Sequence, residues 1–144
     1  LFIFTKAILA SEPIDVYNRG NMERDFTYID DIVEGVIRIT QKAPKPDPNW
    51  LGEAPNPASS SAPHRLYNIG SSSPVQLMDY IQEIEKNLGL KAKLNFMPMQ
   101  DGDVRKSHAD ITDLIRDFDY RPKGTIKEGV EKFIRWYRDY YQVT

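Results

Sequence analysis

The stretch Arg-Asp-Phe-Thr-Tyr-Ile-Asp-Asp, residues 24–31, joins the two patterns that decide the fold. Its first half is extended in pattern, whereas from Asp30 onward apolar residues recur at helical spacing. Asp30 or Asp31 is the natural N-cap of this helix, which should end near Gln41, before Pro44. The stretch therefore predicts a strand that leads directly into an amphipathic helix.

The same patterns, followed outward, predict an α/β chain with about four helices and several short strands. Residues 1–11 have the composition of the end of a truncated helix, which Pro13 closes. Helices are predicted at 30–41, 77–88, 111–118 and 125–141, the last opened by a capping box at Thr125–Glu128. Extended patterns mark residues 14–17, 24–28, 65–69 and 92–97.

Residues 43–64 hold six of the ten prolines and three consecutive serines. So many fixed φ angles and lost N–H donors exclude a helix or a central strand. We expect a long loop insertion within a single unit that spans residues 1–144, because a loop need not separate two domains.

Composition excludes several classes of function. Apolar residues make up 40% of the 144 residues, enough for a packed core, and the formal charge is only −2. A charge this balanced does not favour binding to nucleic acid or to an anionic membrane surface. Cysteine is absent, which excludes thiolate catalysis, and no stretch is apolar enough for a membrane span. We expect a cytoplasmic protein.

The chain offers few catalytic candidates. His64 and His108 lack the spacing of metal ligands, so no metal site is predicted. The Asp30-Asp31 pair could act as acid/base carboxylates, but at the start of an apolar helix it is better explained as an N-cap. The eight glycines are dispersed and form no phosphate-binding loop.

Two places are better candidates for binding. Arg24 stands beside a turn, where a guanidinium can hold a diphosphate in bidentate fashion or form an ion pair with an Asp that simply holds the turn. Residues 97–103, Met-Pro-Met-Gln-Asp-Gly-Asp, form a turn rich in acceptors. Its carboxylate could bind the hydroxyls of a ribose or a sugar, or the segment could be a plain acidic turn.

Several motifs together resemble the nucleotide-sugar epimerases and dehydratases of the extended short-chain dehydrogenase/reductase superfamily. Residues 24–31 are similar to the signature RDFxY(I/V)DD of that family. Further similar segments extend over nearly the whole chain: Tyr-Asn-Ile-Gly at 67–70, Met-Gln-Asp-Gly-Asp-Val at 99–104, Ala-Asp at 109–110, Tyr-Arg-Pro at 120–122 and Glu-Gly-Val at 128–130. Each piece is short, and the composite is specific.

The Pro/Ser-rich insertion before Tyr67, together with Gln100 in place of an Arg, resembles the UDP-glucuronate 4-epimerase branch. Such enzymes interconvert UDP-glucuronate and UDP-galacturonate. The resemblance implies a tightly held NAD that accepts hydride from sugar C4 and returns it to the other face of a 4-keto intermediate. A UDP-glucuronate decarboxylase, a dehydratase or a reductase would share the same binding region.

The resemblance also implies roles for individual residues. Arg24 would clamp the diphosphate, and Asp103 would accept hydrogen bonds from the ribose hydroxyls. Tyr17 would lie near the uracil ring, and Gln100 would replace an Arg that some relatives place on the phosphates. UDP-sugar is thus the expected ligand.

The family's glycine-rich loop, its Tyr-x-x-x-Lys pair and its active-site Ser or Thr do not occur in this chain. We therefore expect no catalytic residue here, and NAD is expected to bind to an N-terminal Rossmann half that is not part of the chain. The chain alone should be an inactive substrate-binding lobe, with possible self-association through residues 1–10. The alternative of another class is a stand-alone, non-catalytic binding or interaction module.

Overall fold

Helices form where apolar residues recur at helical spacing. The computed structural model describes residues 1–144, with helices α1 (Phe2–Leu9), α2 (Ile29–Thr40), α3 (Leu77–Leu88), α4 (Thr112–Phe118) and α5 (Ile126–Tyr141). A short 3₁₀ turn, η1, covers Tyr17–Gly20. The four helices predicted after residue 29 are therefore confirmed, and the predicted helix end near the N-terminus forms a fifth. Gly89 ends α3 in the left-handed conformation, and the capping box opens α5 as expected.

Two small sheets connect distant parts of the chain. Strand β1 (Pro13–Val16) pairs in parallel with β4 (Lys93–Phe96), and β2 (Glu23–Arg24) pairs antiparallel with β3 (Val75–Gln76). The prediction of a strand over residues 65–69 is wrong, because only Arg65 makes an isolated bridge, to Ser59. The apolar alternation of that segment instead reflects contact with α4, where the Tyr67 ring meets Phe118 edge-on.

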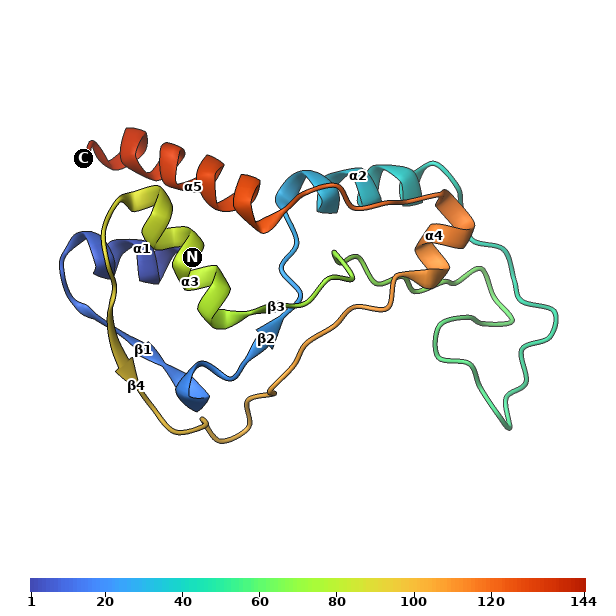
Figure 1. Cartoon of the computed structure of the whole chain (residues 1–144). Helices are drawn as coiled ribbons and strands as arrows, with labels where there is room; N and C mark the ends of the chain where they lie inside the picture. The colour runs from blue at the N-terminus through green and yellow to red at the C-terminus, as the bar shows by residue number, and fades with distance from the viewer.

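The main core lies between α1, α3, α5 and the β1–β4 pair (Figure 1). The buried apolar residues of α3 are Tyr80, Ile81, Ile84 and Leu88, and they belong to one cluster with Val130 and Ile134 of α5. Helix α1 contributes Ile8, and β1 contributes Ile14 and Val16. The spacing of three and four residues on each helix is what places these side chains on one face.

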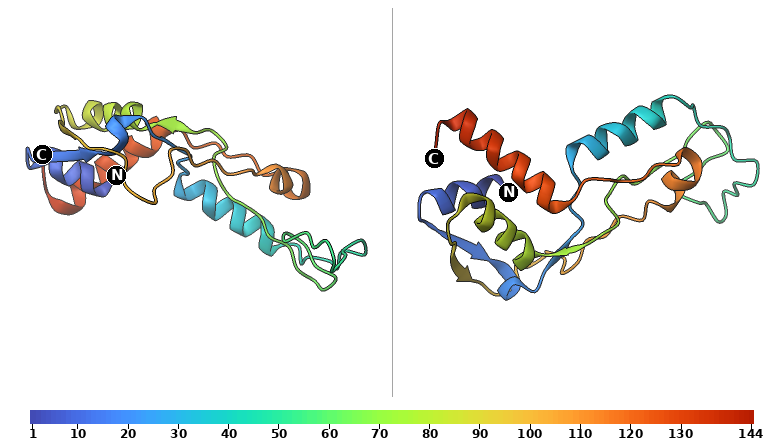
Figure 2. Two further views of the ribbon diagram at one scale, coloured as in Figure 1. Left: turned by 90° about the horizontal axis from the view of Figure 1, so that it is seen from below. Right: turned by 45° about the horizontal axis from the view of Figure 1, so that its top comes forward.

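A second, smaller cluster lies at the other end of the elongated molecule, where α4 lies beside the C-terminal part of α2 (Figure 2). Its buried members are Ile111, Leu114 and Tyr120. Residues 43–64 contain no helix or strand and extend beyond this cluster (Figures 1 and 2). None of the helices has the length and apolar character needed to cross a membrane.

The start of α2 differs from the expectation. Its N-cap is Tyr28, with no side-chain cap, so the prediction of Asp30 or Asp31 as the cap is wrong. The Asp31 carboxylate is buried and accepts hydrogen bonds from the backbone N–H groups of Lys123 and Gly124, at 2.9 and 2.8 Å. The carboxylate thus holds the segment before α5 against α2, which helical spacing alone does not reveal.

Candidate functional site

The four sequence-predicted binding residues lie around the carboxyl ends of the parallel strands β1 and β4. Tyr17 follows β1 directly and is half-buried at the start of η1. Gln100 and Asp103 flank the turn that follows β4, where the Asp103 N–H donates to the Gln100 carbonyl at 3.2 Å. In α/β sheets, ligands bind outside the carboxyl ends of parallel strands, so this edge is a reasonable place for a site.

Backbone hydrogen bonds hold these segments together. The N–H of Asn18 donates to the Pro98 carbonyl at 3.3 Å, and that of Arg19 donates to the Met97 carbonyl at 3.1 Å. Asn18 and Arg19 both adopt left-handed backbone angles, with φ of 49° and 51°, which makes the turn tight. The segment after β4 runs beside η1 and β2 at the lower edge of Figure 1.

Arg24 is held from two sides. Its Nη1 donates to the carbonyls of Glu23 and Arg105, at 2.9 and 3.3 Å, and its Nη2 forms an ion pair with Asp103 Oδ1 at 2.9 Å. The Arg24–Asp ion pair left open by the sequence is therefore present. The structure brings together the two residues for which the resemblance implies contacts to different parts of one ligand.

The Asp103 carboxylate accepts a hydrogen bond from the backbone of its own turn. Its Oδ1 also accepts from the Val104 N–H at 2.8 Å, and Gly102 adopts φ of +80°, which an L residue rarely reaches. Gln100 is exposed and its side chain makes no hydrogen bond. Asp103 thus has a backbone donor beside its partner Arg24, whereas the Gln100 side chain has no hydrogen-bond partner.

Asp25 is a residue whose role sequence reasoning missed. Its carboxylate accepts from the Ser71 hydroxyl and from the backbone N–H groups of Ser72 and Ala109, at 3.1 and 2.9 Å. Burial by itself would raise the pKa of Asp25, but these hydrogen bonds outweigh it and lower the pKa below its ordinary value. Asp25 thereby ties the residues next to Arg24 to two remote segments, and only its place inside the motif could have signalled this.

The rim of the site is charged. Lys106 Nζ pairs with Glu23 Oε2 at 2.8 Å, and this contact is the main reason why the pKa of Glu23 is lowered. Arg105 Nη2 donates to Asn21 Oδ1 at 3.0 Å. Three cationic side chains, Arg24, Arg105 and Lys106, therefore lie near the β2 strand, and of these only Arg105 has no carboxylate partner.

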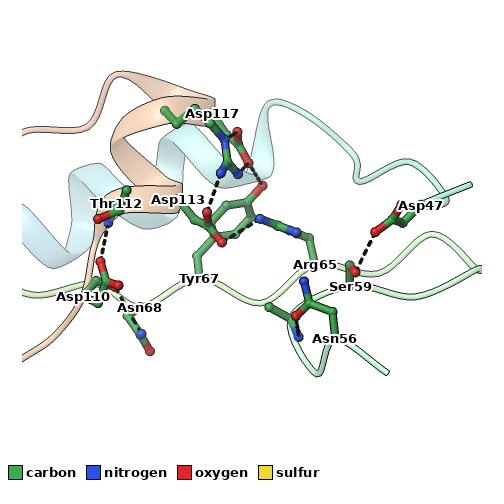
Figure 3. A network of polar contacts seen from close by, with 12 residues as sticks. Asp47, Asn56, Ser59, Arg65, Tyr67, Asn68, Asp110, Thr112, Asp113 and Asp117 are labelled. Atoms are coloured by element: carbon green, nitrogen blue, oxygen red, sulfur yellow. Dashed lines mark hydrogen bonds and ion pairs between the residues drawn. The ribbon is translucent and has the colours of Figure 1, made fainter. Parts of the chain in front are cut away.

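Figure 3 shows a separate polar network at the base of the 43–64 loop. Arg65 Nη2 pairs with Asp113 Oδ2 at 2.6 Å, and the Tyr67 hydroxyl donates to Asp117 Oδ2 at 2.8 Å. Asp47 accepts from the Ser59 hydroxyl at 2.9 Å within the loop. The network fastens the loop to α4. No group of His, Asp or Glu in the chain is arranged to hold a metal ion.

The residues present do not fit a dinucleotide-phosphate site. Such a site needs a glycine-rich turn that leaves open space at a helix start, and no helix here has a glycine at its N-cap. Gly20 follows β1, but the space beside it is filled by Met78, whose sulfur would lie 2.6 Å from a Cβ. No step of any reaction is therefore assigned to NAD on these residues.

Comparison with known proteins identifies a matching family over the first half of the chain. Residues 1–70 match the family described as NAD dependent epimerase/dehydratase family. Residues 1–70 are therefore part of an epimerase-family domain, and the resemblance expected from the sequence motifs is confirmed.

Individual relatives extend the similarity to the whole chain. The chain is 51% identical to Protein CapI of Staphylococcus aureus over 142 residues, which is 99% of this chain and 42% of that protein. It is 39% identical to a probable UDP-glucuronate 4-epimerase of Rhizobium meliloti, again over 99% of this chain and 42% of the relative. The chain thus spans about two fifths of the curated relatives it matches.

A solved structure shows the same fold. The UDP-glucuronic acid 4-epimerase from Bacillus cereus, in complex with UDP-glucuronic acid and NAD, aligns with a TM-score of 0.75 and 25% identity. The alignment covers 96% of this chain and 39% of that one. The expected fold class, part of the α/β fold of an extended short-chain dehydrogenase/reductase, is thereby confirmed.

Proposed function

We propose that this chain is the nucleotide-sugar-binding lobe of an NAD-dependent 4-epimerase that interconverts UDP-glucuronate and UDP-galacturonate through a 4-keto intermediate. The observation that carries the proposal is the meeting of Arg24 and Asp103 at the carboxyl edge of β1 and β4. A guanidinium suits a diphosphate, and a carboxylate suits a vicinal diol. UDP-sugars supply both groups on one molecule.

In this proposal each residue has a binding or orienting task. Arg24 holds the diphosphate, Asp103 accepts from the ribose hydroxyls, and Tyr17 contacts the uracil ring from η1. Gln100 is free to reach the phosphates, as an uncharged group where some relatives carry an Arg. The sugar would extend away from this edge, so this chain binds and orients the nucleotide and supplies no proton or hydride.

We further propose that a separate NAD-binding Rossmann part packs on α2. The apolar side chains Ile29, Val33, Val36 and Ile37 of this helix are 48–59% exposed, although its spacing is that of a helix with a buried face. A cavity of about 240 Å³, lined among others by Phe26, Tyr28 and Tyr80, continues this surface from Ile29. The portion of the relatives that this chain does not span is the occupant we assign to it.

Two other functions remain as alternatives. The same lobe could belong to a UDP-glucuronate decarboxylase, a dehydratase or a reductase, because several solved neighbours of different activity share the fold, including a dTDP-glucose 4,6-dehydratase from Bacillus anthracis at a TM-score of 0.74. A stand-alone binding module would bind UDP equally well. The second alternative differs from the proposal because it needs no NAD-binding partner.

A nuclear magnetic resonance titration tests the proposed lobe. UDP added to the ¹⁵N-labelled chain should shift amide signals of residues 17–24 and 97–105 and leave those of α4 unchanged. Shifts confined to α4 and the 43–64 loop would contradict the proposal. A parallel assay of the purified chain with UDP-glucuronate and NAD should show no turnover, and measurable epimerisation would contradict the assignment of a binding lobe.

A further inference from the structure

We infer that Asp103 makes this site selective for ligands that carry a ribose as well as a diphosphate, because in the free chain it accepts from one of the Arg24 N–H donors that would bind the phosphates. This inference rests on the proposed function and adds a specificity device to it. Its geometric basis is the ion pair between Arg24 Nη2 and Asp103 Oδ1 at 2.9 Å.

The two partners of this ion pair are anchored independently of each other. Arg24 is held through Nη1 by the carbonyls of Glu23 and Arg105, so its guanidinium stays in place when Asp103 turns away. The Asp103 carboxylate has its own backbone partner, the Val104 N–H at 2.8 Å. Both side chains are partly accessible, with 26% and 35% exposed. Breaking the pair therefore frees two prepositioned groups and disturbs no buried atom.

The consequence depends on what the ligand offers. Nη2 carries two N–H donors, and one of them binds Asp103. A free pyrophosphate that takes both donors displaces Asp103, which is then left with no cationic partner and faces a new anion. A nucleoside diphosphate displaces the same carboxylate but gives it two ribose hydroxyls as donors. Uridine offers donors to Asp103 but nothing to Arg24. The pair thus penalises a ligand that satisfies only one of its members.

The surrounding charges do not provide the same selection. Lys106 is neutralised by Glu23 at 2.8 Å, and the guanidinium of Arg105 points to Asn21. Asp101 lies in the same turn as Asp103, is exposed and forms no ion pair with any cation. Removal of the Asp101 charge therefore changes the general field of the turn without changing the ion pair, which makes it a matched control.

Isothermal titration of the 144-residue chain with pyrophosphate, uridine and UDP tests the inference. Asp103→Asn should bind pyrophosphate about three- to fivefold more tightly than the wild type, the range expected for loss of a competing exposed ion pair. The same variant should bind UDP and uridine more weakly. Asp101→Asn should change pyrophosphate binding by less than about twofold, because exposed charges at this distance are screened by salt.

The outcomes separate the inference from the proposed function. Equal pyrophosphate affinity of Asp103→Asn and Asp101→Asn would overturn the inference, even when UDP still binds and Arg24→Ala still abolishes that binding. If Arg24→Ala and Asp103→Asn both bind UDP as tightly as the wild type, the proposed function itself is overturned. A circular dichroism spectrum identical to that of the wild type shows that each variant is folded.

Discussion

The carboxylate of Asp25 accepts a hydrogen bond from the backbone N–H of Ala109, 84 positions further along the chain, at 2.9 Å. Asp31, in the same eight-residue motif, accepts from the N–H groups of Lys123 and Gly124. Two of the three carboxylates in the motif thus hold remote segments in place. This arrangement gives the motif a structural role beside the binding role that we propose for Arg24.

Replacement of Asp25 by Asn should destabilise the chain. The charged carboxylate accepts from several donors, and hydrogen bonds to charged groups contribute roughly 1.5–3 kcal/mol each, so a loss of about 2 kcal/mol in the free energy of unfolding is expected. Urea denaturation at pH 7 measures it. Asp101→Asn, in an exposed turn, should stay within about 0.5 kcal/mol of the wild type, and an equal loss in both variants would contradict the role of Asp25.

The same contacts make stability depend on acid. Because the pKa of Asp25 is lowered on folding from the ordinary value of 3.8, its contribution is fully present above about pH 4. The contribution should disappear as the pH falls through the lowered pKa of the folded chain. The difference in unfolding free energy between the wild type and Asp25→Asn should therefore be constant from pH 7 to 5 and shrink below pH 4. A difference that grows in acid would contradict this account.

Gly70 should not tolerate a methyl group. A Cβ at this position would overlap the Ala109 side chain and lie 3.1 Å from Asp25 Oδ2. Gly70→Ala should therefore lower the unfolding free energy by about 1–3 kcal/mol, the usual range for overpacking. Gly52→Ala is the control, because its Cβ would meet only the Trp50 ring at 3.8 Å. Equal midpoints of thermal unfolding for the two variants would show that the close approach is unimportant.

Tyr67 and Tyr120 allow a comparison of a tyrosine hydroxyl that has a hydrogen-bond partner with one that has none. The Tyr67 hydroxyl donates to Asp117, whereas the buried Tyr120 hydroxyl has no partner. Tyr67→Phe should cost about 1–2 kcal/mol, because Asp117 loses a donor, and Tyr120→Phe should be neutral or slightly stabilising. Urea titration of both variants gives the comparison. The reverse order of stability would contradict the hydrogen bonding described for the two side chains.

The structure shows which of the first ten residues are exposed and could take part in the predicted self-association. Thr5 and Ile8 of α1 are buried, but Ile3 is 77% exposed. Sedimentation velocity should show that Ile3→Lys reduces any concentration-dependent association, since it places a charge on the apolar patch. Leu51→Lys changes an equally apolar, 66% exposed residue in the 43–64 loop and should have no effect. Association that responds only to Leu51→Lys would exclude α1 as the contact.

Local spacing is sufficient to predict where the helices lie, but not the N-cap of α2, which is Tyr28 rather than Asp30 or Asp31. Thr125 and Glu128 form the capping box that their spacing predicts. The segment 65–69 was misread because its alternation arises from packing against α4, a contact that no local pattern encodes. For the same reason, the sequence could not predict which backbone N–H groups donate to Asp25 and Asp31.

The sequence was enough to predict which residues belong to the candidate site, but not the contacts between them. The resemblance implied Arg24, Asp103, Tyr17 and Gln100, and the structure places their segments at one edge. Spacing could not show that Arg24 and Asp103 bind each other, since 79 residues separate them. The register of β1 with β4 and the bridge between Glu23 and Lys106 create that contact, and both are tertiary features.

The central claim is that Arg24 binds the diphosphate of a uridine nucleotide, and calorimetric titration of UDP into the chain tests it most directly. Arg24→Ala should weaken binding by about 10- to 150-fold, which corresponds to the roughly 1.5–3 kcal/mol of a charge-assisted hydrogen bond. Arg135→Ala, which removes an exposed arginine from α5, should leave the affinity unchanged. Equal UDP affinity of the wild type and Arg24→Ala would contradict the claim.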